Sequence, residues 1–164
     1  MKNSDLSGAD LKSKIREKIK GRVVIAGIGN IIRGDDGLGP KLIEILKSKN
    51  ANASLFDCGT APENYIFPIL SAPSDTVILI DAADIGLTPG GIKVLNLEDI
   101  SGVSFSTHNP SPRLFTDLLK TGKEDLNIFV ISMQPKTTAL GSAISQDVLE
   151  GLRSLSDALV EALG

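Results

Sequence analysis

Three polar residues could form one reactive site: Asp36, Asp81 and His108. Asp36 stands in a glycine-rich segment, residues 27–40, between a predicted strand and a predicted helix. Asp81 is the first polar residue after the apolar run Thr76–Ile80, and open α/β sheets place their ligand crevice at the carboxyl ends of strands. Two carboxylates and one imidazole suit a divalent transition metal and leave coordination positions open to substrate or water. These residue types alone do not identify the metal.

Each of these residues also has a plainer interpretation. One aspartate of the Asp35-Asp36 pair could cap the following helix, and an aspartate after a strand such as Asp81 is often a turn former. A cap needs only one residue, so we assign Asp35 to capping and Asp36 to function. His108 lies in Ser106–Pro112, where the prolines disfavour helix in the residues before them. We therefore expect a loop there, and a lone histidine in a loop could be purely structural.

Other chemistries fit the sequence less well. A dinucleotide-binding loop would place its third glycine at position 32, where Ile32 stands, and acidic residues at that place would repel a phosphate. Cys58 could be a nucleophile with His108 as its base, although a free cysteine is also a common small core residue. The sequence contains neither G-x-S-x-G nor H-E-x-x-H, so a standard serine hydrolase or zincin is unsupported.

Strands that alternate with helices must position these groups, which predicts a three-layer α/β/α sandwich. A glycine-containing turn before the fourth strand, in place of a helical crossover, favours an antiparallel direction for that strand. The predicted strands are Val23–Ala26, Ala53–Phe56, Thr76–Ile80, Ile92–Leu97 and Asn127–Ser132. The predicted helices are Ser7–Lys20, Leu38–Lys49, Pro62–Leu70, Pro112–Lys120 and Ser145–Leu163.

The chain length of 164 residues fits one domain. We expect residues 22–164 to form a single α/β domain and residues 1–21 to form an N-terminal amphipathic helical extension. In that extension Leu11, Ile15 and Ile19 are spaced four apart, as on the apolar face of a helix. We expect this helix to pack against its own domain, with a partner-docking role as the alternative.

Composition excludes several classes of protein. A net charge of −3 and 4% aromatic residues with no Trp leave little for a nucleic-acid surface. The apolar runs are far shorter than the roughly 20 residues of a membrane-spanning helix, so we expect no membrane insertion. A single cysteine forms no internal disulfide, and the N-terminus has no stretch resembling a signal peptide. We therefore expect a cytoplasmic protein, and a monomer.

Several motifs in order resemble those of the hydrogenase maturation proteases, which trim the C-terminus of the large subunit of nickel-iron hydrogenases. The motifs are Gly27-Ile28-Gly29-Asn30, Asp35-Asp36-Gly37-Leu38-Gly39, Ile80-Asp81-Ala82 and Ser106-Thr107-His108-Asn109. Two further segments, Gly59–Asn64 and Met133–Pro135, look like the subgroup that serves hydrogenase 3. The resemblance covers residues 23–163 and implies a twisted five-stranded sheet with one antiparallel strand.

The resemblance implies an aspartic-type endopeptidase that removes a short C-terminal peptide from a nickel-loaded large-subunit precursor. The family's nickel-binding positions fall on Asp36, Asp81 and His108, which are then both the metal and the catalytic residues. Nickel would be engaged weakly, as the substrate's own ion, and would act mainly as a recognition element. The alternatives are a nickel-delivery chaperone without peptidase activity and a nucleotide-binding module.

Overall fold

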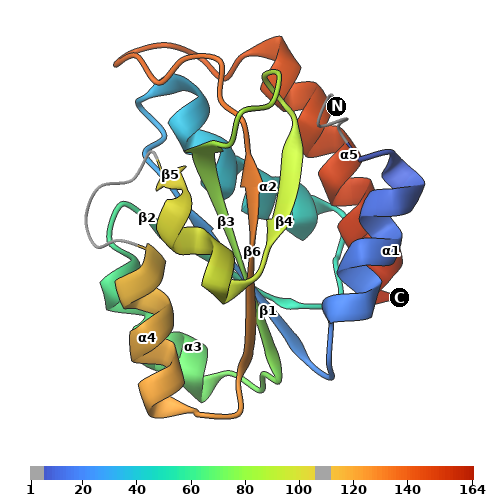
Figure 1. The fold of residues 1–164 in the computed structure, drawn as a ribbon, viewed down its shortest axis with the longest axis vertical. Coiled ribbons are helices and arrows are strands. Elements are labelled where there is room, and N and C mark those ends of the chain that lie inside the picture. The colour runs from blue at the N-terminus through green and yellow to red at the C-terminus, as the bar shows by residue number, and fades with distance from the viewer. Residues whose placement is uncertain (1–5, 106–111) are drawn as a thin grey trace.

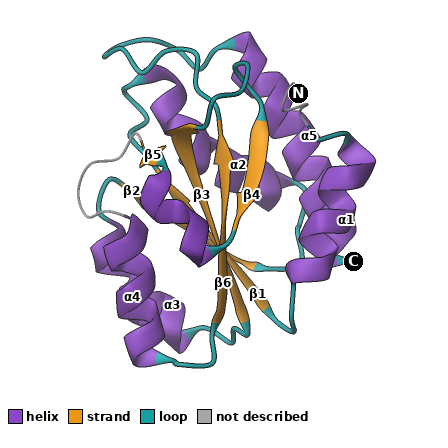
Figure 2. Ribbon diagram, in the orientation of Figure 1, coloured by secondary structure: helices purple, strands orange, loops and turns teal. Residues whose placement is uncertain are grey.

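A mixed β-sheet lies between two layers of helices in the computed structural model, which describes residues 6–105 and 112–164 (Figure 1; Figure 2). The strands are β1 (Val23–Ile28), β2 (Ser54–Gly59), β3 (Thr76–Asp84), β4 (Ile92–Leu95), β5 (Ser104–Phe105) and β6 (Asn127–Met133). Their order is β2-β1-β3-β6-β4, and β5 pairs with the end of β3. The predicted α/β/α sandwich is confirmed, including the antiparallel direction of the fourth predicted strand, β4, beside β6, but the sheet has six strands rather than five because β5 adds a short one.

Three helices cover one face of the sheet: α1 (Gly8–Lys18), α2 (Leu38–Ser48) and α5 (Gln146–Leu163). The other face is covered by α3 (Ile66–Ser71), α4 (Pro112–Gly122) and the 3-10 helix η3 (Leu97–Gly102). Two further 3-10 helices are η1 (Gly34–Gly37) and η2 (Pro62–Tyr65). Because helices cover both faces, β1, β3 and β6 are buried along nearly their whole length and read as continuous apolar runs.

The N-terminal helix α1 packs along α5, side by side in Figure 1. Leu11 and Ile15 are buried in the core beneath it, and Ser7 caps its first turn by accepting a hydrogen bond from the backbone of Asp10. Arg16 donates to the carbonyl of Glu161 on α5 at 2.9 Å. Within the described residues, no helix has the length and apolar character needed to cross a bilayer.

The structure corrects several strand ends: β1 continues to Ile28 rather than Ala26, and β2 continues to Gly59 rather than Phe56. The third strand does not stop at Ile80: β3 continues to Asp84, because β6 pairs with it up to Ala82 and β5 pairs with Ala83 and Asp84. The fourth strand ends at Leu95 rather than Leu97, because Asn96 opens η3 with a capping box. The two-residue strand β5 was not predicted, since two residues carry no periodicity.

Backbone contact without intervening side chains fixes α2 against the sheet. A Cβ added at Gly39 would lie 2.4 Å from the carbonyl oxygen of Ile28 and 2.9 Å from that of Ile80. A Cβ added at Gly27, on β1, would lie 2.4 Å from the carbonyl oxygen of Gly39. Only glycine fits at both positions, so the first turn of α2 rests directly on the ends of β1 and β3.

Replacing Gly39 by alanine should therefore lower the free energy of unfolding by about 1–3 kcal/mol, the usual cost of overpacking. Gly102→Ala is the matched control, because a Cβ there meets nothing within 4 Å, and its effect should stay within about 0.5 kcal/mol. Urea unfolding of the three proteins measures both values. Equal midpoints for Gly39→Ala and the unchanged protein would contradict the close approach.

Candidate active site

The 3-10 turn η1 places Asp36 at the edge of the sheet where β1 ends. Its carboxylate Oδ2 accepts a hydrogen bond from the backbone of Asn30 at 3.1 Å, and its own N–H donates to the carbonyl of Arg33 at 3.0 Å. The residue is only 5% exposed, so this carboxylate is largely buried. η1 also lies against β3, the strand that carries Asp81.

Asp35 does not cap a helix, contrary to the prediction. The N-cap of α2 is Gly37, and no side chain caps either η1 or α2. Asp35 is instead fully buried, and its Oδ2 accepts hydrogen bonds from the backbone of Lys136 at 2.8 Å and of Thr137 at 3.2 Å. Ser145 donates its backbone N–H to Oδ1 at 2.7 Å and its hydroxyl to Oδ2 at 2.9 Å. This one carboxylate joins η1 to the segment that leads into α5.

Asp81 lies inside β3 and is 1% exposed, rather than standing in a turn after the strand. β1 pairs with β3 only up to Ile80, so Asp81 is the first residue of β3 beyond that pairing, while β6 continues beside it. The close approach of Gly39 to the Ile80 carbonyl places the start of α2 next to the residue that precedes Asp81. The structure thus gathers the turn of Asp36 and the strand of Asp81 at one edge of the sheet, as predicted.

His108 lies outside the described residues, and so does the predicted loop around it. In the rest of the chain, no three His, Cys, Asp or Glu side chains cluster in a way that could hold a metal. The structure places the residues on either side of that segment. Phe105 pairs with Ala83, two residues past Asp81, and α4 begins at Pro112.

Cys58 is an unsuitable nucleophile in this fold. It lies in β2, is 2% exposed and packs in the core cluster that contains Ala26 and Ile28. Burial, with a smaller contribution from the neighbouring Asp57 carboxylate, raises the pKa of its thiol to about 12. A thiol of this kind stays protonated at neutral pH, and only the thiolate is reactive.

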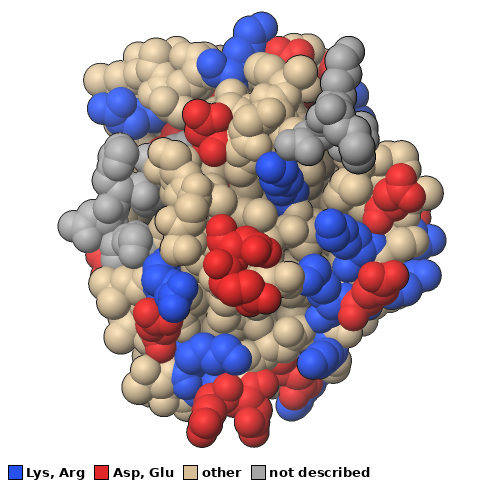
Figure 3. Space-filling view, viewed as in Figure 1, with Lys and Arg blue, Asp and Glu red and all other residues tan. Residues whose placement is uncertain are grey.

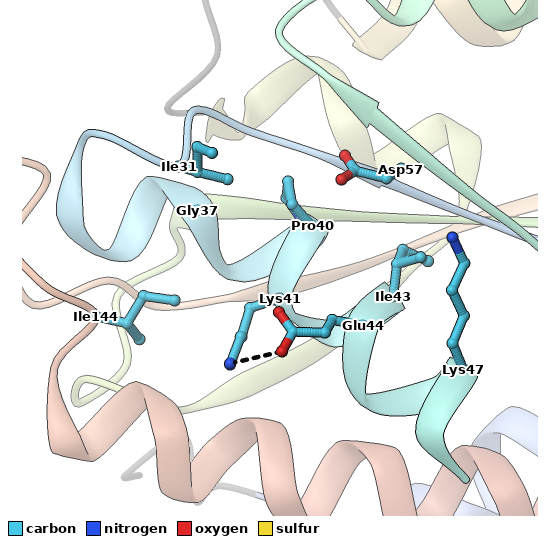
Figure 4. Close-up of a pocket in the computed structure, with 9 residues that line it drawn as sticks. All are labelled: Ile31, Gly37, Pro40, Lys41, Ile43, Glu44, Lys47, Asp57 and Ile144. Carbon is cyan, nitrogen blue, oxygen red and sulfur yellow. Dashed lines mark hydrogen bonds and ion pairs between the residues drawn. The ribbon is translucent and has the colours of Figure 1, made fainter.

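A hollow of about 450 Å³ begins at Gly37, the residue after Asp36, and extends along α2 (Figure 4). Its apolar lining is Ile31, Pro40, Ile43 and Ile144, and its charged lining is Lys41, Glu44, Lys47 and Asp57. Lys41 and Glu44 form an ion pair at 3.2 Å, drawn as a dashed line in the figure. Elsewhere, acidic and basic side chains are interspersed on the face drawn in Figure 3, with no broad basic area.

Gln134, which was not predicted as a functional residue, connects the segments around the ends of β3 and β6 by hydrogen bonds. Its side-chain Oε1 accepts from the backbone of Ile85 at 2.8 Å, its N–H donates to Gly91 at 2.8 Å, and its carbonyl accepts from Gly90 at 2.8 Å. A glutamine directly after a buried strand was the available signal. These bonds hold the residue after β3 and the residues before β4 beside the end of β6.

Two buried carboxylates from adjoining elements give this edge a defined chemistry. A buried carboxylate is stabilised by a cation or by hydrogen-bond donors, and can act as a metal ligand or as a base toward water. In the ionised form, these carboxylates would repel anionic groups such as phosphates. The geometry therefore favours a cation-dependent reaction over nucleotide binding.

Comparison with known proteins gives consistent matches. The sequence model of a family described as hydrogenase maturation protease matches residues 39–162, a range that begins just after Asp36. The hydrogenase 3 maturation protease of Escherichia coli (strain K12) is 30% identical over 135 residues, covering 80% of this chain and 85% of that protein.

Two solved structures share this fold at 30% sequence identity. The crystal structure of a NiFe hydrogenase maturation protease, HycI, from Thermococcus kodakarensis KOD1 has a TM-score of 0.81, covering 92% of this chain and 98% of that one. The solution structure of the endopeptidase HycI from Escherichia coli has a TM-score of 0.78, covering 88% of this chain and 92% of that one.

Cys58→Ala should retain full peptidase activity, because the thiol is buried and protonated. At pH 8 a thiol with a pKa of about 12 is about one part in 10⁴ thiolate, so iodoacetamide should neither label nor inhibit the native protein. Mass spectrometry after alkylation, together with a cleavage assay, checks both statements. A folded but inactive Cys58→Ala protein would restore the thiol-protease alternative.

Proposed function

This chain belongs to the hydrogenase maturation protease family, and we propose that it removes a short C-terminal peptide from the nickel-loaded large-subunit precursor of a nickel-iron hydrogenase. The observation that carries this proposal is the 30% identity to a hydrogenase 3 maturation protease over 80% of the chain. The gathering of Asp36 and Asp81 at one sheet edge adds a site of suitable chemistry. We place the reaction in the cytoplasm and take the enzyme to be a monomer.

Asp36, Asp81 and His108 are the residues that engage the nickel ion in this proposal. The turn η1 lies against β3, which supports a shared site for the two carboxylates. Phe105 pairs with Ala83 at the end of β3, and the three residues from Phe105 to His108 reach at most about 11 Å. The imidazole therefore belongs to a segment that starts beside Asp81.

The nickel ion belongs to the substrate and serves to select it. Two carboxylates and one imidazole leave a transition metal incompletely coordinated, so the ligands that the precursor already supplies complete the shell. This contact positions the precursor so that water attacks the scissile carbonyl next to the carboxylates. One carboxylate accepts a proton from the water and passes it to the leaving amine as the C–N bond breaks, and the other orients the reacting groups. No covalent intermediate with the enzyme is required.

The surface around η1 supports a polypeptide substrate. Ile31, Ile32 and Leu140 are 72%, 58% and 65% exposed, and the Gly141 N–H donates to the Ile32 carbonyl at 2.8 Å, so the two loops adjoin. The hollow along α2 continues from Gly37 with an apolar lining and charges of both signs. An extended chain, with its alternating side chains and polar backbone, suits such a groove.

Alanine at Asp36, Asp81 or His108 should reduce precursor cleavage by at least a hundredfold. Because Asp36 and Asp81 are buried, each of these two substitutions should also cost about 1–3 kcal/mol of stability, which a domain of this size tolerates. Initial cleavage rates by mass spectrometry and urea unfolding provide the two readouts.

Asp35→Ala is the matched control for Asp36→Ala. It removes the acceptor of four hydrogen bonds, so it should destabilise the fold more than Asp36→Ala does. At temperatures where it stays folded, it should cleave faster than Asp36→Ala. Full activity in Asp36→Ala would remove that residue from the site. Nickel transfer with no change in precursor mass would instead support a delivery chaperone.

Cleavage should depend on nickel in the precursor. A precursor from nickel-starved cells lacks the coordination bonds to the enzyme, and losing about 4 kcal/mol of binding lowers capture about a thousandfold. We would follow the mass of the large subunit from nickel-replete and nickel-starved cells after adding the enzyme. Equal cleavage of both forms would reject nickel recognition while leaving the peptidase assignment intact.

A further inference from the structure

Ser132 stands directly beside Asp81 in the sheet. The two residues are register partners in the parallel pairing of β6 with β3. Partners in a parallel pair point to the same face, and neighbouring strands lie about 4.8 Å apart. Leu79 and Val130, the preceding partners on that face, pack in the core beneath α3 and α4. The Ser132 hydroxyl and the Asp81 carboxylate are therefore adjacent groups on one face.

The Ser132 hydroxyl is a buried polar group whose hydrogen-bonding capacity is unused. The residue is 0% exposed, and its Oγ has no hydrogen-bond partner among residues 6–105 and 112–164. Its register partner on the other side is Lys93 of β4, whose ammonium donates to the carbonyl of Ile85 at 3.1 Å. Burying a hydroxyl without a partner is unfavourable, so a serine here needs a reason other than core packing.

We propose that Ser132 is a positioning residue for Asp81, with its hydroxyl donating a hydrogen bond to the Asp81 carboxylate when that carboxylate engages the substrate. Rotation about the Cα–Cβ bond of Ser132 would turn its hydroxyl toward the neighbouring Asp81 carboxylate. This inference rests on the proposed function, because it takes Asp81 to be a site residue.

The hydrogen bond would fix which carboxylate oxygen faces the substrate's ion. A carboxylate that binds a metal through one oxygen is oriented by a donor to its other oxygen, and loss of such a partner typically costs about 10–100-fold in metal affinity or activity. Because Ser132 is itself fully buried, it acts through Asp81 rather than by touching the substrate.

The test is Ser132→Ala, assayed on nickel-replete precursor with kcat and KM determined separately. We expect kcat/KM to fall about 10–100-fold. The melting temperature should be unchanged or raised, because alanine removes a buried hydroxyl without a partner. A residue needed only for packing would move activity and melting temperature down together. Ser132→Thr keeps the hydroxyl and should retain more activity than Ser132→Ala.

Ser74→Ala is the matched control. Ser74 is 1% exposed, and its Oγ likewise has no hydrogen-bond partner within the described part of the chain. It precedes β3, at the opposite end of that strand from Asp81. Ser74→Ala should therefore cleave the precursor at the normal rate.

The outcomes separate this inference from the proposed function. Full activity of Ser132→Ala, with Asp81→Ala inactive, would overturn the role of Ser132 and leave the site standing. A slow Ser132→Ala protein with a clearly lowered melting temperature, or an equally slow Ser74→Ala protein, would also overturn it. Full activity of Asp81→Ala would reject the proposed site, and the positioning role would fall with it.

Discussion

The direct contact between the backbones of α2 and the sheet is the constraint on which the candidate active-site edge depends. Gly27 and Gly39 leave no room for a side chain, so α2 begins at a fixed height above the ends of β1 and β3. The turn η1 leads directly into the first turn of α2, so the same contact sets its position relative to the sheet. The position of Asp36 relative to Asp81 follows from this contact.

The adjacent residues Asp35 and Asp36 make different contacts at this edge of the sheet. Asp35 satisfies both of its carboxylate oxygens with donors from a distant segment and holds the loops together. Asp36 turns its carboxylate to the backbone of Asn30, at the end of β1. Two buried carboxylates at one edge suit a cation, which agrees with the proposed selection of the substrate through its metal ion. Asp35 thus anchors the loops, and its neighbour Asp36 contributes to the preference for a cation.

The sequence predicted the long elements well because their apolar periodicity and length are local properties. The strand at residues 76–80 and the helix at 38–49 needed no tertiary information. The extension of β3 past Asp81 was unpredictable, because it depends on pairing with β5, which is distant along the chain. The same reason applies to Asp35: nothing near it in sequence reveals donors at Ser145. Asp36 and Asp81 were predicted as site residues because acids at strand ends stand out, whereas Ser132, at the end of a predicted strand, was given no role.

The hydrogen bonds of Asp35 affect the order in which the protein folds during synthesis. They join residues 101 to 110 positions apart in the chain. Contacts of such separation form late, because long-range loop closure is slow. During synthesis on the ribosome, the turn that carries Asp36 lacks its anchor until residues 136–145 have emerged. A nascent chain that has not yet reached Lys136 has none of the donors that the Asp35 carboxylate uses in the folded protein.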